Sequence, residues 1–315
     1  VAYCLRDAGG ASGAHRSPPR YLKRLPDAVG KLLVTPWALW SARRRDRAAV
    51  VHFHGFGASL WAPLAKALGL KVVSHSHGIE WERARWNGPH RRFLYFIAWV
   101  TCRFSDRVLV VSRKEADAYA ARFGVECLVV PGGFEAHRAA ADCRAPRQKV
   151  VVLAGRPVPE KRILETVEAW NAIADHAGHT LRVYCSGSYG GGQLERIRAA
   201  CAAGRDVEFM PFVSREEFLA ALTASSYYVA LSSLEGRSLA MLEALATGNA
   251  LVVADTPENR EFVPSEGNRF VPANASAEEI AAALGALLHA AAPDSAIREQ
   301  NVRAGTSRSW ADVRR

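Results

Sequence analysis

Short apolar runs that alternate with segments of helical periodicity are the feature that most constrains the fold of this chain. Each run is rich in Val, Leu and Phe and shows little polar alternation, which is typical of strands in a parallel sheet covered on both faces. Strands separated by helices indicate βαβ units, so the sequence predicts an α/β fold. The runs are Ala49–Phe53, Lys71–Ser74, Arg107–Val111, Cys127–Val130, Lys149–Ala154, Leu181–Cys185, Val207–Phe212, Tyr227–Leu231 and Ala250–Ala254.

The intervening segments carry the periodicity of amphipathic helices. Pro159–Ala174, Arg215–Ala224 and Ala277–Ala291 are the clearest of them. A chain of 315 residues favours two domains, and Phe134–Gln148 lacks apolar periodicity just before a new strand. We therefore expect three parts.

The first part, residues 1–146, is predicted to be an N-terminal Rossmann-like domain. No Gly-rich strand–turn–helix unit is found at its start, so we expect its first βα unit to be missing. Residues 147–295 are predicted to form a C-terminal Rossmann-like domain. Residues 296–315 form the third part.

The net charge of +10 favours partners that carry phosphate, which include nucleotides, nucleic acids and anionic lipids. An Arg-rich and Ala-rich composition explains the charge equally well without any function. No RNA-binding or DNA-binding motif is found, so a nucleic-acid partner is not expected. The six cysteines form no Cys-x-x-Cys pair and lie mostly in apolar segments, which indicates reduced thiols and a cytoplasmic protein.

The segment Ser232–Asn249 is the sharpest motif in the sequence. An apolar strand ends in small polar residues, a Glu-Gly turn follows, and a helix is predicted from about Ser238 to Gly248. Ligands of open α/β sheets bind at the carboxyl ends of strands, and the N–H groups of a helix N-terminus bind phosphate or sugar oxygens. Glu243 stands on an otherwise apolar helix face, where its carboxylate could accept hydrogen bonds from the vicinal hydroxyls of a ribose. The alternative reading is a surface Glu that stabilises the helix N-terminus.

A second motif is Leu153–Arg162, in which a strand ends in Gly-Arg and a helix begins near Glu160. Arg156 and Lys161 would then lie at the carboxyl edge of the sheet, where two cations can neutralise a diphosphate. The alternative reading is a solvated loop with ordinary surface charges.

Glu235 and Glu243, with seven residues between them, and the turn at residues 155–161 together resemble retaining GT-B glycosyltransferases of family four. The resemblance extends over about residues 50–310. It implies two Rossmann-like domains whose parallel sheets face a cleft, with residues 1–146 on the acceptor side. It also implies that residues 296–315 begin a helix that returns toward the first domain. It also implies that Arg156 and Lys161 bind the donor diphosphate, that Glu243 holds the nucleotide ribose, and that Glu235 lies near the hydroxyls of the donor sugar.

The resemblance assigns further donor contacts. The loop of Gly236, Arg237, Ser238 and Leu239 would contact sugar and phosphate through its backbone, and Phe212 and Val213 would flank the nucleobase. His77, in a His-Gly pair after a strand, would lie near the donor sugar and is the second expected catalytic residue beside Glu235.

Two His-x-His pairs, His52 with His54 and His75 with His77, raise the question of a metal site. Residues at i and i+2 share a strand face only loosely, and no carboxylate or Cys completes a ligand set. We therefore expect no metal and no other cofactor, which agrees with a family that needs none.

The first half also carries aromatic and basic clusters. Trp81, Arg83, Arg85 and Trp86 favour contact with an acceptor or a membrane surface as strongly as they favour a loop with buried tryptophans. The run Arg43–Arg47 and the pair Arg91-Arg92 could touch anionic lipid at the inner face of the membrane, although such runs are usually solvated loops. The apolar stretch Phe93–Phe104 is too short to span a bilayer, which needs about 20 residues.

The resemblance implies transfer of a sugar from a nucleotide-sugar to a glycan or lipid-linked acceptor with retention of configuration, as in polysaccharide and cell-wall biosynthesis. Two alternatives remain open. One is a sugar-nucleotide epimerase of GT-B-like fold, and the other is a non-catalytic protein that binds nucleotide-sugars.

Overall fold

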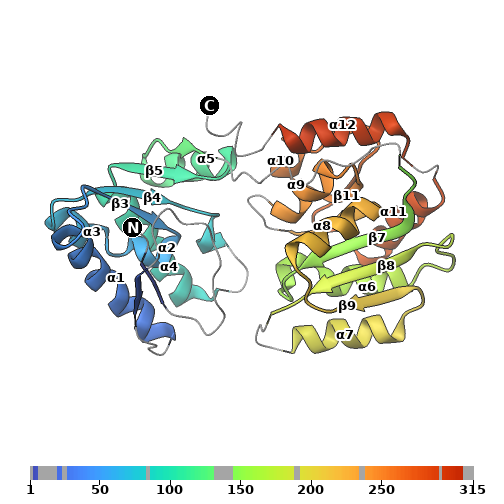
Figure 1. The fold of residues 1–315 in the computed structure, drawn as a ribbon, viewed down its shortest axis with the longest axis horizontal. Coiled ribbons are helices and arrows are strands. Elements are labelled where there is room, and N and C mark those ends of the chain that lie inside the picture. Colours follow the sequence, from blue (N-terminus) through green and yellow to red (C-terminus); the bar gives the residue numbers. More distant parts are fainter. Residues whose placement is uncertain are drawn as a thin grey trace. The chain divides into compact units, whose positions relative to one another are not determined.

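The computed structural model describes residues 3–5, 20–22, 27–82, 86–130, 145–187, 192–233, 238–290 and 293–307. The chain divides into two compact units, Val1–Val130 and Pro131–Arg315. The boundary predicted at residues 146 and 147 lies directly before the first strand of the second unit. Each unit contains a parallel sheet with flanking helices (Figure 1).

The sheet of unit 1 has four parallel strands in the order β3-β4-β5-β6. Two short strands, β1 (Tyr3–Leu5) and β2 (Arg20–Leu22), pair with each other in parallel outside this sheet. The strands of the sheet are β3 (Val50–His54), β4 (Lys71–His75), β5 (Arg107–Val110) and β6 (Leu128–Val129). The helices are α1 (Asp27–Arg44), α2 (Phe56–Ser59), α3 (Ala62–Ala67), η1 (Glu80–Glu82), α4 (Gly88–Phe104) and α5 (Arg113–Phe123).

One face of the unit 1 sheet builds its apolar core. Phe53 and Val72 pack with Leu39 of α1 and with α3, while Val108 and Val110 pack with α4. Because side chains alternate along a strand, His52, His54 and His75 lie on the opposite face. This alternation places polar rings together at the carboxyl edge of β3 and β4.

Trp81 belongs to the core of unit 1. It is buried, and its ring lies 5.3 Å from the ring of Tyr119 and 5.8 Å from that of Phe123 between centroids. Of the two readings that the sequence left open for the Trp–Arg cluster, the buried tryptophan therefore applies to Trp81. Arg83 and Arg85 lie outside the described residues.

The sheet of unit 2 has six parallel strands in the order β12-β11-β10-β7-β8-β9. Numbered within this unit, the order is 3-2-1-4-5-6, the doubly wound arrangement of a Rossmann fold, whose direction reverses between β7 and β10. The strands are β7 (Gln148–Gly155), β8 (Thr180–Cys185), β9 (Val207–Met210), β10 (Ser225–Ala230), β11 (Ala250–Asp255) and β12 (Arg269–Pro272).

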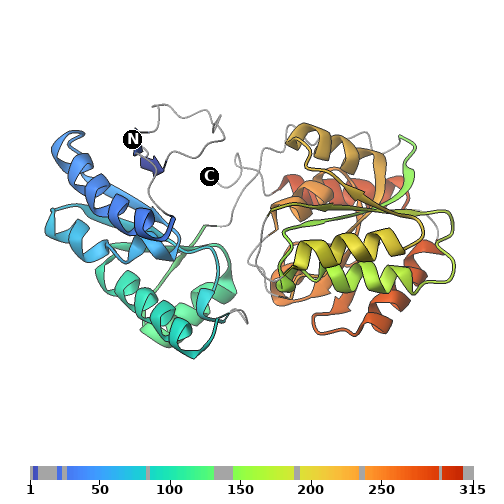
Figure 2. The same ribbon diagram turned by 90° about the horizontal axis from the view of Figure 1, so that it is seen from below.

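Helices cover both faces of this sheet, as the continuous apolar strands predicted (Figures 1 and 2). On one face, alternate strand residues such as Leu153 and Val183 pack with α6, α7 and α11. On the other face, Val152 and Leu251 pack with α8 and α9. The helices are η3 (Pro159–Lys161), α6 (Ile163–Asn171), α7 (Gln193–Ala203), α8 (Arg215–Ala224), α9 (Leu239–Ala246), α10 (Pro257–Arg260), α11 (Ala277–Leu288) and α12 (Ser295–Thr306).

The described part of the C-terminal helix, α12, packs on α9 within unit 2. Gly305 is buried against this helix, and a Cβ atom there would lie 2.5 Å from the backbone nitrogen of Ala246. Asn301 is fully buried and donates to the carbonyl of Asn249 at 2.8 Å. The helix expected to run toward the first domain is thus anchored on the second domain as far as Thr306, and residues 308–315 lie outside the described part.

The predicted strands agree with those of the structure to within about two residues at each end. The predicted helix Pro159–Ala174 differs, because it is broken into η3 and α6 at Arg162, which adopts the left-handed region at φ 52°. In the part of the chain that the structure describes, no helix is long and apolar enough to cross a membrane.

Candidate donor-binding site and histidine cluster

A pocket of about 620 Å³ opens at the carboxyl edge of the unit 2 sheet. Its walls come from the ends of β7 and β8, the loop that follows β9, and the first turns of α8 and α9. In doubly wound sheets, ligands bind outside the carboxyl ends of strands where the strand order reverses. The pocket lies in that position, since β7 and the helix that follows β10 both line it.

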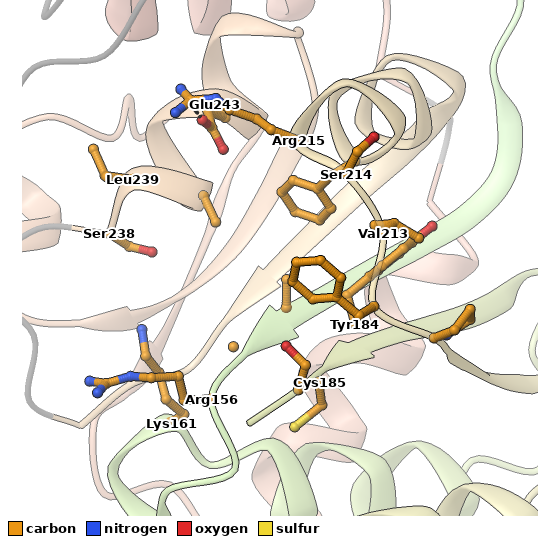
Figure 3. A pocket seen from close by; sticks show the side chains of 17 residues that line it. Arg156, Lys161, Tyr184, Cys185, Val213, Ser214, Arg215, Ser238, Leu239 and Glu243 are labelled. Atoms are coloured by element: carbon orange, nitrogen blue, oxygen red, sulfur yellow. Dashed lines mark ion pairs between the residues drawn. The ribbon is translucent and has the colours of Figure 1, made fainter. Parts of the chain in front are cut away.

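Arg156 and Lys161 both line this pocket, and Figure 3 shows their side chains next to each other on one side of it. Gly155 permits the close packing of this turn, because a Cβ atom there would lie 3.2 Å from Ile163 and 3.5 Å from the stem of Lys161. The carbonyl of Glu160 accepts a hydrogen bond from the N–H of Ser233 at 2.9 Å. The two sequence motifs are thereby joined at one edge of the sheet.

The neighbouring Arg162 has a structural role instead. Its guanidinium donates to the carbonyl of Ala273 at 3.0 Å and also to that of Ala275. These contacts hold the start of α6 against the segment after β12. Of the three cationic residues in this turn, Arg156 and Lys161 line the pocket, whereas Arg162 does not.

Glu243 lies on the other side of the pocket, one turn into α9, where it is only 6% exposed. Its Oε1 atom lies 2.6 Å from a guanidinium nitrogen of Arg215. Burial raises the pKa of the Glu243 carboxyl, and the charge of Arg215 opposes this shift. Figure 3 shows the pair across the pocket from Arg156 and Lys161, so a ligand could contact the carboxylate at one end and two cations at the other.

Sequence reasoning missed Arg215. It is the first residue of α8, whose capping box joins Ser214 and Glu217. Its position in the sequence was a usable signal. A cation at the start of a helix that directly follows the predicted nucleobase loop must lie near that loop. Its pairing with Glu243 depends on the packing of α8 beside α9, which the sequence does not display.

The remaining donor residues predicted from the sequence fall into two groups. Phe212 and Val213 lie in the loop between β9 and α8 and line the pocket, as do Ser238, the N-cap of α9, and Leu239. Phe212 is 84% exposed. Glu235, Gly236 and Arg237 lie outside the described residues, between Ser233 and Ser238.

His77 lies in unit 1, directly after β4, and belongs to a cluster of four imidazole rings. The strand register pairs His54 with His75, so both lie on the same face of the sheet. Ring centroids are 4.2 Å apart for His52 and His54, 4.5 Å for His75 and His77, and 5.5 Å for His54 and His75. The sequence suggested only two loosely arranged pairs, but parallel pairing of β3 with β4 gathers all four rings.

Burial and neighbouring imidazoles lower the pKa values of three of these histidines. The pKa of His75 falls to about 4, mainly through burial and then through His77, His54 and His52. Burial also lowers the pKa of His52, with His54 and His77 adding to the shift, and it lowers that of His77, with His54 adding. These three rings are therefore neutral at physiological pH.

Glu115, another residue that sequence reasoning missed, holds the loop that carries His77. Its buried carboxylate accepts from the N–H of Gly78 and from the N–H of Val111, each at 3.1 Å. Burial raises the pKa of this carboxyl, and the hydrogen bonds from Ser76, Val111 and Gly78 oppose the shift. A detectable signal was the Ser-x-x-Glu pattern at residues 112–115, since Ser112 does cap α5.

The two units match two family models in succession. Residues 1–138 match Glycosyltransferase Family 4, and residues 141–304 match Glycosyl transferases group 1. Among curated proteins, none matches this chain in sequence.

Solved structures show the same fold at low identity. Sucrose-phosphate synthase from Thermosynechococcus elongatus has a TM-score of 0.77 at 18% identity, over 98% of this chain and 84% of that protein. Anabaena HepE, solved with UDP and glucose, has a TM-score of 0.77 at 14% identity, over 94% of this chain and 83% of that protein. A glycosyltransferase from Rickettsia africae has a TM-score of 0.71 at 14% identity, over 94% of this chain and 82% of that protein.

The fold, the family matches and the strand order of the unit 2 sheet all indicate the same architecture. The two parallel-sheet domains have the GT-B architecture, which confirms the fold predicted from the sequence. The group 1 match alone spans more than half of the chain. This chain is therefore a GT-B glycosyltransferase that belongs to the Glycosyl transferases group 1 family and carries a Glycosyltransferase Family 4 domain at its N-terminal end.

Proposed function

We propose that this glycosyltransferase moves a sugar from a nucleotide-sugar donor to a glycan or lipid-linked acceptor with retention of anomeric configuration. One observation carries the donor part of the proposal, namely that Arg156 and Lys161 line one side of the unit 2 pocket while Glu243 lines the other. A nucleoside diphosphate needs cations for its phosphates and an acceptor for its ribose hydroxyls. The structure of HepE holds UDP and glucose, which supports a donor of this class.

In this proposal different pocket residues bind the ribose, the nucleobase and the diphosphate of the donor. The Glu243 carboxylate accepts hydrogen bonds from two ribose hydroxyls, and Phe212 and Val213 flank the nucleobase. Arg156, Lys161 and the N–H groups at the start of α9 contact the diphosphate. Because these cations and amides lie in place before the reaction, they stabilise the charge that develops on the leaving group, and the diphosphate itself requires no metal.

The proposed reaction breaks the bond between the anomeric carbon and the phosphate oxygen and forms a bond to the acceptor hydroxyl on the same face of the sugar. The hydroxyl proton passes to an oxygen of the departing nucleoside diphosphate. Glu235 and His77 are assigned to hold the donor sugar through its hydroxyls, and Gly236 and Arg237 to contact sugar and phosphate with Ser238 and Leu239. Glu115 would keep His77 in position through its bond to the N–H of Gly78.

Incubation with a panel of nucleotide-sugars, with and without glycan acceptors, tests this proposal. We expect release of nucleoside diphosphate that depends on one donor and one acceptor, and NMR of the product should show the anomeric configuration of the donor. Inverted product would contradict retention. Interconversion of the sugar without release would identify an epimerase instead, and binding without turnover in any mixture would identify a binding protein.

We also propose peripheral contact with an anionic membrane, where lipid-linked acceptors are held. Phe93, Phe96 and Trp99 of α4 are each about half exposed and recur at helical spacing, with the exposed Arg92 and Arg103 on the same helix. Aromatic side chains can enter the interface while arginines meet anionic headgroups. The exposed Trp37 and Trp40 of α1, followed by Arg43 and Arg44 in its last turn, repeat this composition.

Cosedimentation with vesicles tests the membrane proposal. Binding should be stronger to phosphatidylserine–phosphatidylcholine vesicles than to pure phosphatidylcholine, and it should weaken in Phe93→Ser–Trp99→Ser and at high salt. Equal and weak pelleting with both vesicle types would contradict the proposed contact.

A further inference from the structure

The four-histidine cluster of unit 1 offers more than the orientation of a donor sugar. Ligand atoms of His52, His54 and His75 all lie within 4.8 Å of one another. We propose that these three histidines bind a divalent transition-metal ion of the zinc type. The site lies in unit 1, whereas the donor pocket is built from unit 2, and the proposal does not depend on the glycosyl transfer described above.

The pairing of β3 with β4 places the three histidines next to one another. His52 and His54 lie at i and i+2 on β3, and His75 lies opposite His54 on the neighbouring strand β4. Strand pairing therefore directs three imidazoles to one face of the sheet, on rigid elements rather than on a loop. A metal site was not expected from the sequence because only a Cys or a carboxylate was considered as the third ligand. The pairing of β3 with β4 supplies a histidine, His75, as the third ligand instead.

His75 shows a second feature of a metal ligand. Its side chain is only 8% exposed, and within the described part of the chain its buried Nε2 atom has no hydrogen-bond partner. A buried polar nitrogen without a partner needs an explanation, and coordination of a metal ion would supply one.

Only small side-chain movements would close the site. Zn–N bonds of about 2.0–2.1 Å in a tetrahedron place the nitrogens roughly 3.4 Å apart. His52 and His54 are exposed, so their rings can rotate inward toward the buried His75. His77 lies beside the set, with its Nε2 atom 3.4 Å from Nδ1 of His54.

The three imidazole ligands indicate which metal ions the site would bind and how many of the ligands the protein supplies. Imidazole ligands favour Zn²⁺, Co²⁺, Ni²⁺ and Cu²⁺, whereas Mg²⁺ and Ca²⁺ prefer oxygen ligands. A set of three protein ligands leaves a fourth position for water or for an anionic group. The ion would also link the carboxyl ends of β3 and β4, so its binding should stabilise the folded chain.

Metal titration of the full chain tests this proposal. After treatment with a chelator and its removal, the protein is titrated with Zn²⁺ by calorimetry and with Co²⁺ by visible absorption. The variant is His52→Ala–His54→Ala, which removes two exposed rings and leaves the buried His75 in place. The control is His289→Ala, an exposed histidine at the end of α11 in unit 2.

We expect one equivalent of Zn²⁺ to bind the wild-type chain and the control with equal affinity, and the Co²⁺ form to show the intense visible bands of a tetrahedral site. The double variant should bind at least 100-fold more weakly and lose the rise in melting temperature that Zn²⁺ gives the wild type. Mg²⁺ should not bind. The absence of a one-to-one Zn²⁺ complex in the wild type, or unchanged affinity in the double variant, would overturn the proposal.

Discussion

Arg215 and Glu243 form a 2.6 Å ion pair in the wall of the unit 2 pocket, between the first residue of α8 and the second turn of α9. Glu243 is buried while the Arg215 side chain is 43% exposed. The charge of Arg215 therefore opposes the effect of burial on the pKa of Glu243, while part of the Arg215 side chain still lines the pocket. Its burial and its pairing with Arg215 distinguish Glu243 from an ordinary surface Glu near a helix N-terminus.

Glu243→Gln should weaken nucleotide binding selectively. The substitution keeps the size of the side chain but removes the negative charge, and a hydrogen bond to a charged group contributes about 1.5–3 kcal/mol. We expect the affinity for the nucleoside diphosphate to fall about 10-fold to 100-fold in calorimetry. Inorganic pyrophosphate, which has no ribose, serves as the control ligand and should bind both proteins equally. A matching loss for both ligands would show that Glu243 does not contact the ribose.

Arg215→Met should shift the pH dependence of donor binding. Burial raises the pKa of the Glu243 carboxyl and Arg215 opposes that shift, so removal of the cation raises the pKa further. If the ionised carboxylate binds the ribose, affinity is present above this pKa and falls as the pH drops through it. The acid limb should then begin at a higher pH in the variant. An intact nucleotide-sugar is the right ligand, since its diphosphate diester does not titrate in this range, and superimposable profiles would contradict the assignment.

Most of the fold could be predicted because the apolar strands of a buried parallel sheet are visible locally. Strands β7 and β11 follow from continuous runs of Val, Leu and Ala. The α9 helix follows from Ser238 as its N-cap and Gly248 at its end, where the structure has a φ of 80°. Helix α1 was not anticipated, because Pro36 lies inside it and its apolar residues show little periodicity. Strand β12 was also missed, since it is a short edge strand that ends in Pro272.

Only part of the candidate site could be predicted from the sequence, because some of its contacts form between elements that are far apart in the chain. Arg156, Lys161 and Glu243 lie at strand ends and helix starts, so local pattern and the family resemblance located them together. Arg215 and the contact of Glu115 with Gly78 depend on how separate elements pack. The meeting of His54 with His75 likewise depends on the register of β3 against β4, which no local pattern reveals.

Two glycine substitutions should change stability in opposite directions and test the docking of α12 on unit 2. A Cβ atom at Gly305 would meet the backbone of Ala246 at 2.5 Å, so Gly305→Ala must push the two helices apart. We expect a loss of about 1–3 kcal/mol in the free energy of unfolding, measured by urea denaturation. Gly285→Ala is the matched control in α11, where a Cβ would meet nothing within 4 Å, and should add about 0.5–1 kcal/mol through helix propensity. Equal effects of the two substitutions would contradict the close packing of α12 on α9.

Calorimetric titration of nucleoside diphosphates into the wild-type chain and into Arg156→Ala–Lys161→Ala tests the central claim most directly. If the unit 2 pocket is the donor site, at least one of UDP, GDP and ADP binds the wild type at one equivalent. The double variant should then bind that ligand about 100-fold more weakly, because two cations that contact the diphosphate have been removed. The affinity of the double variant for inorganic pyrophosphate should fall as well. A double variant that binds the nucleoside diphosphate as tightly as the wild type would contradict the account.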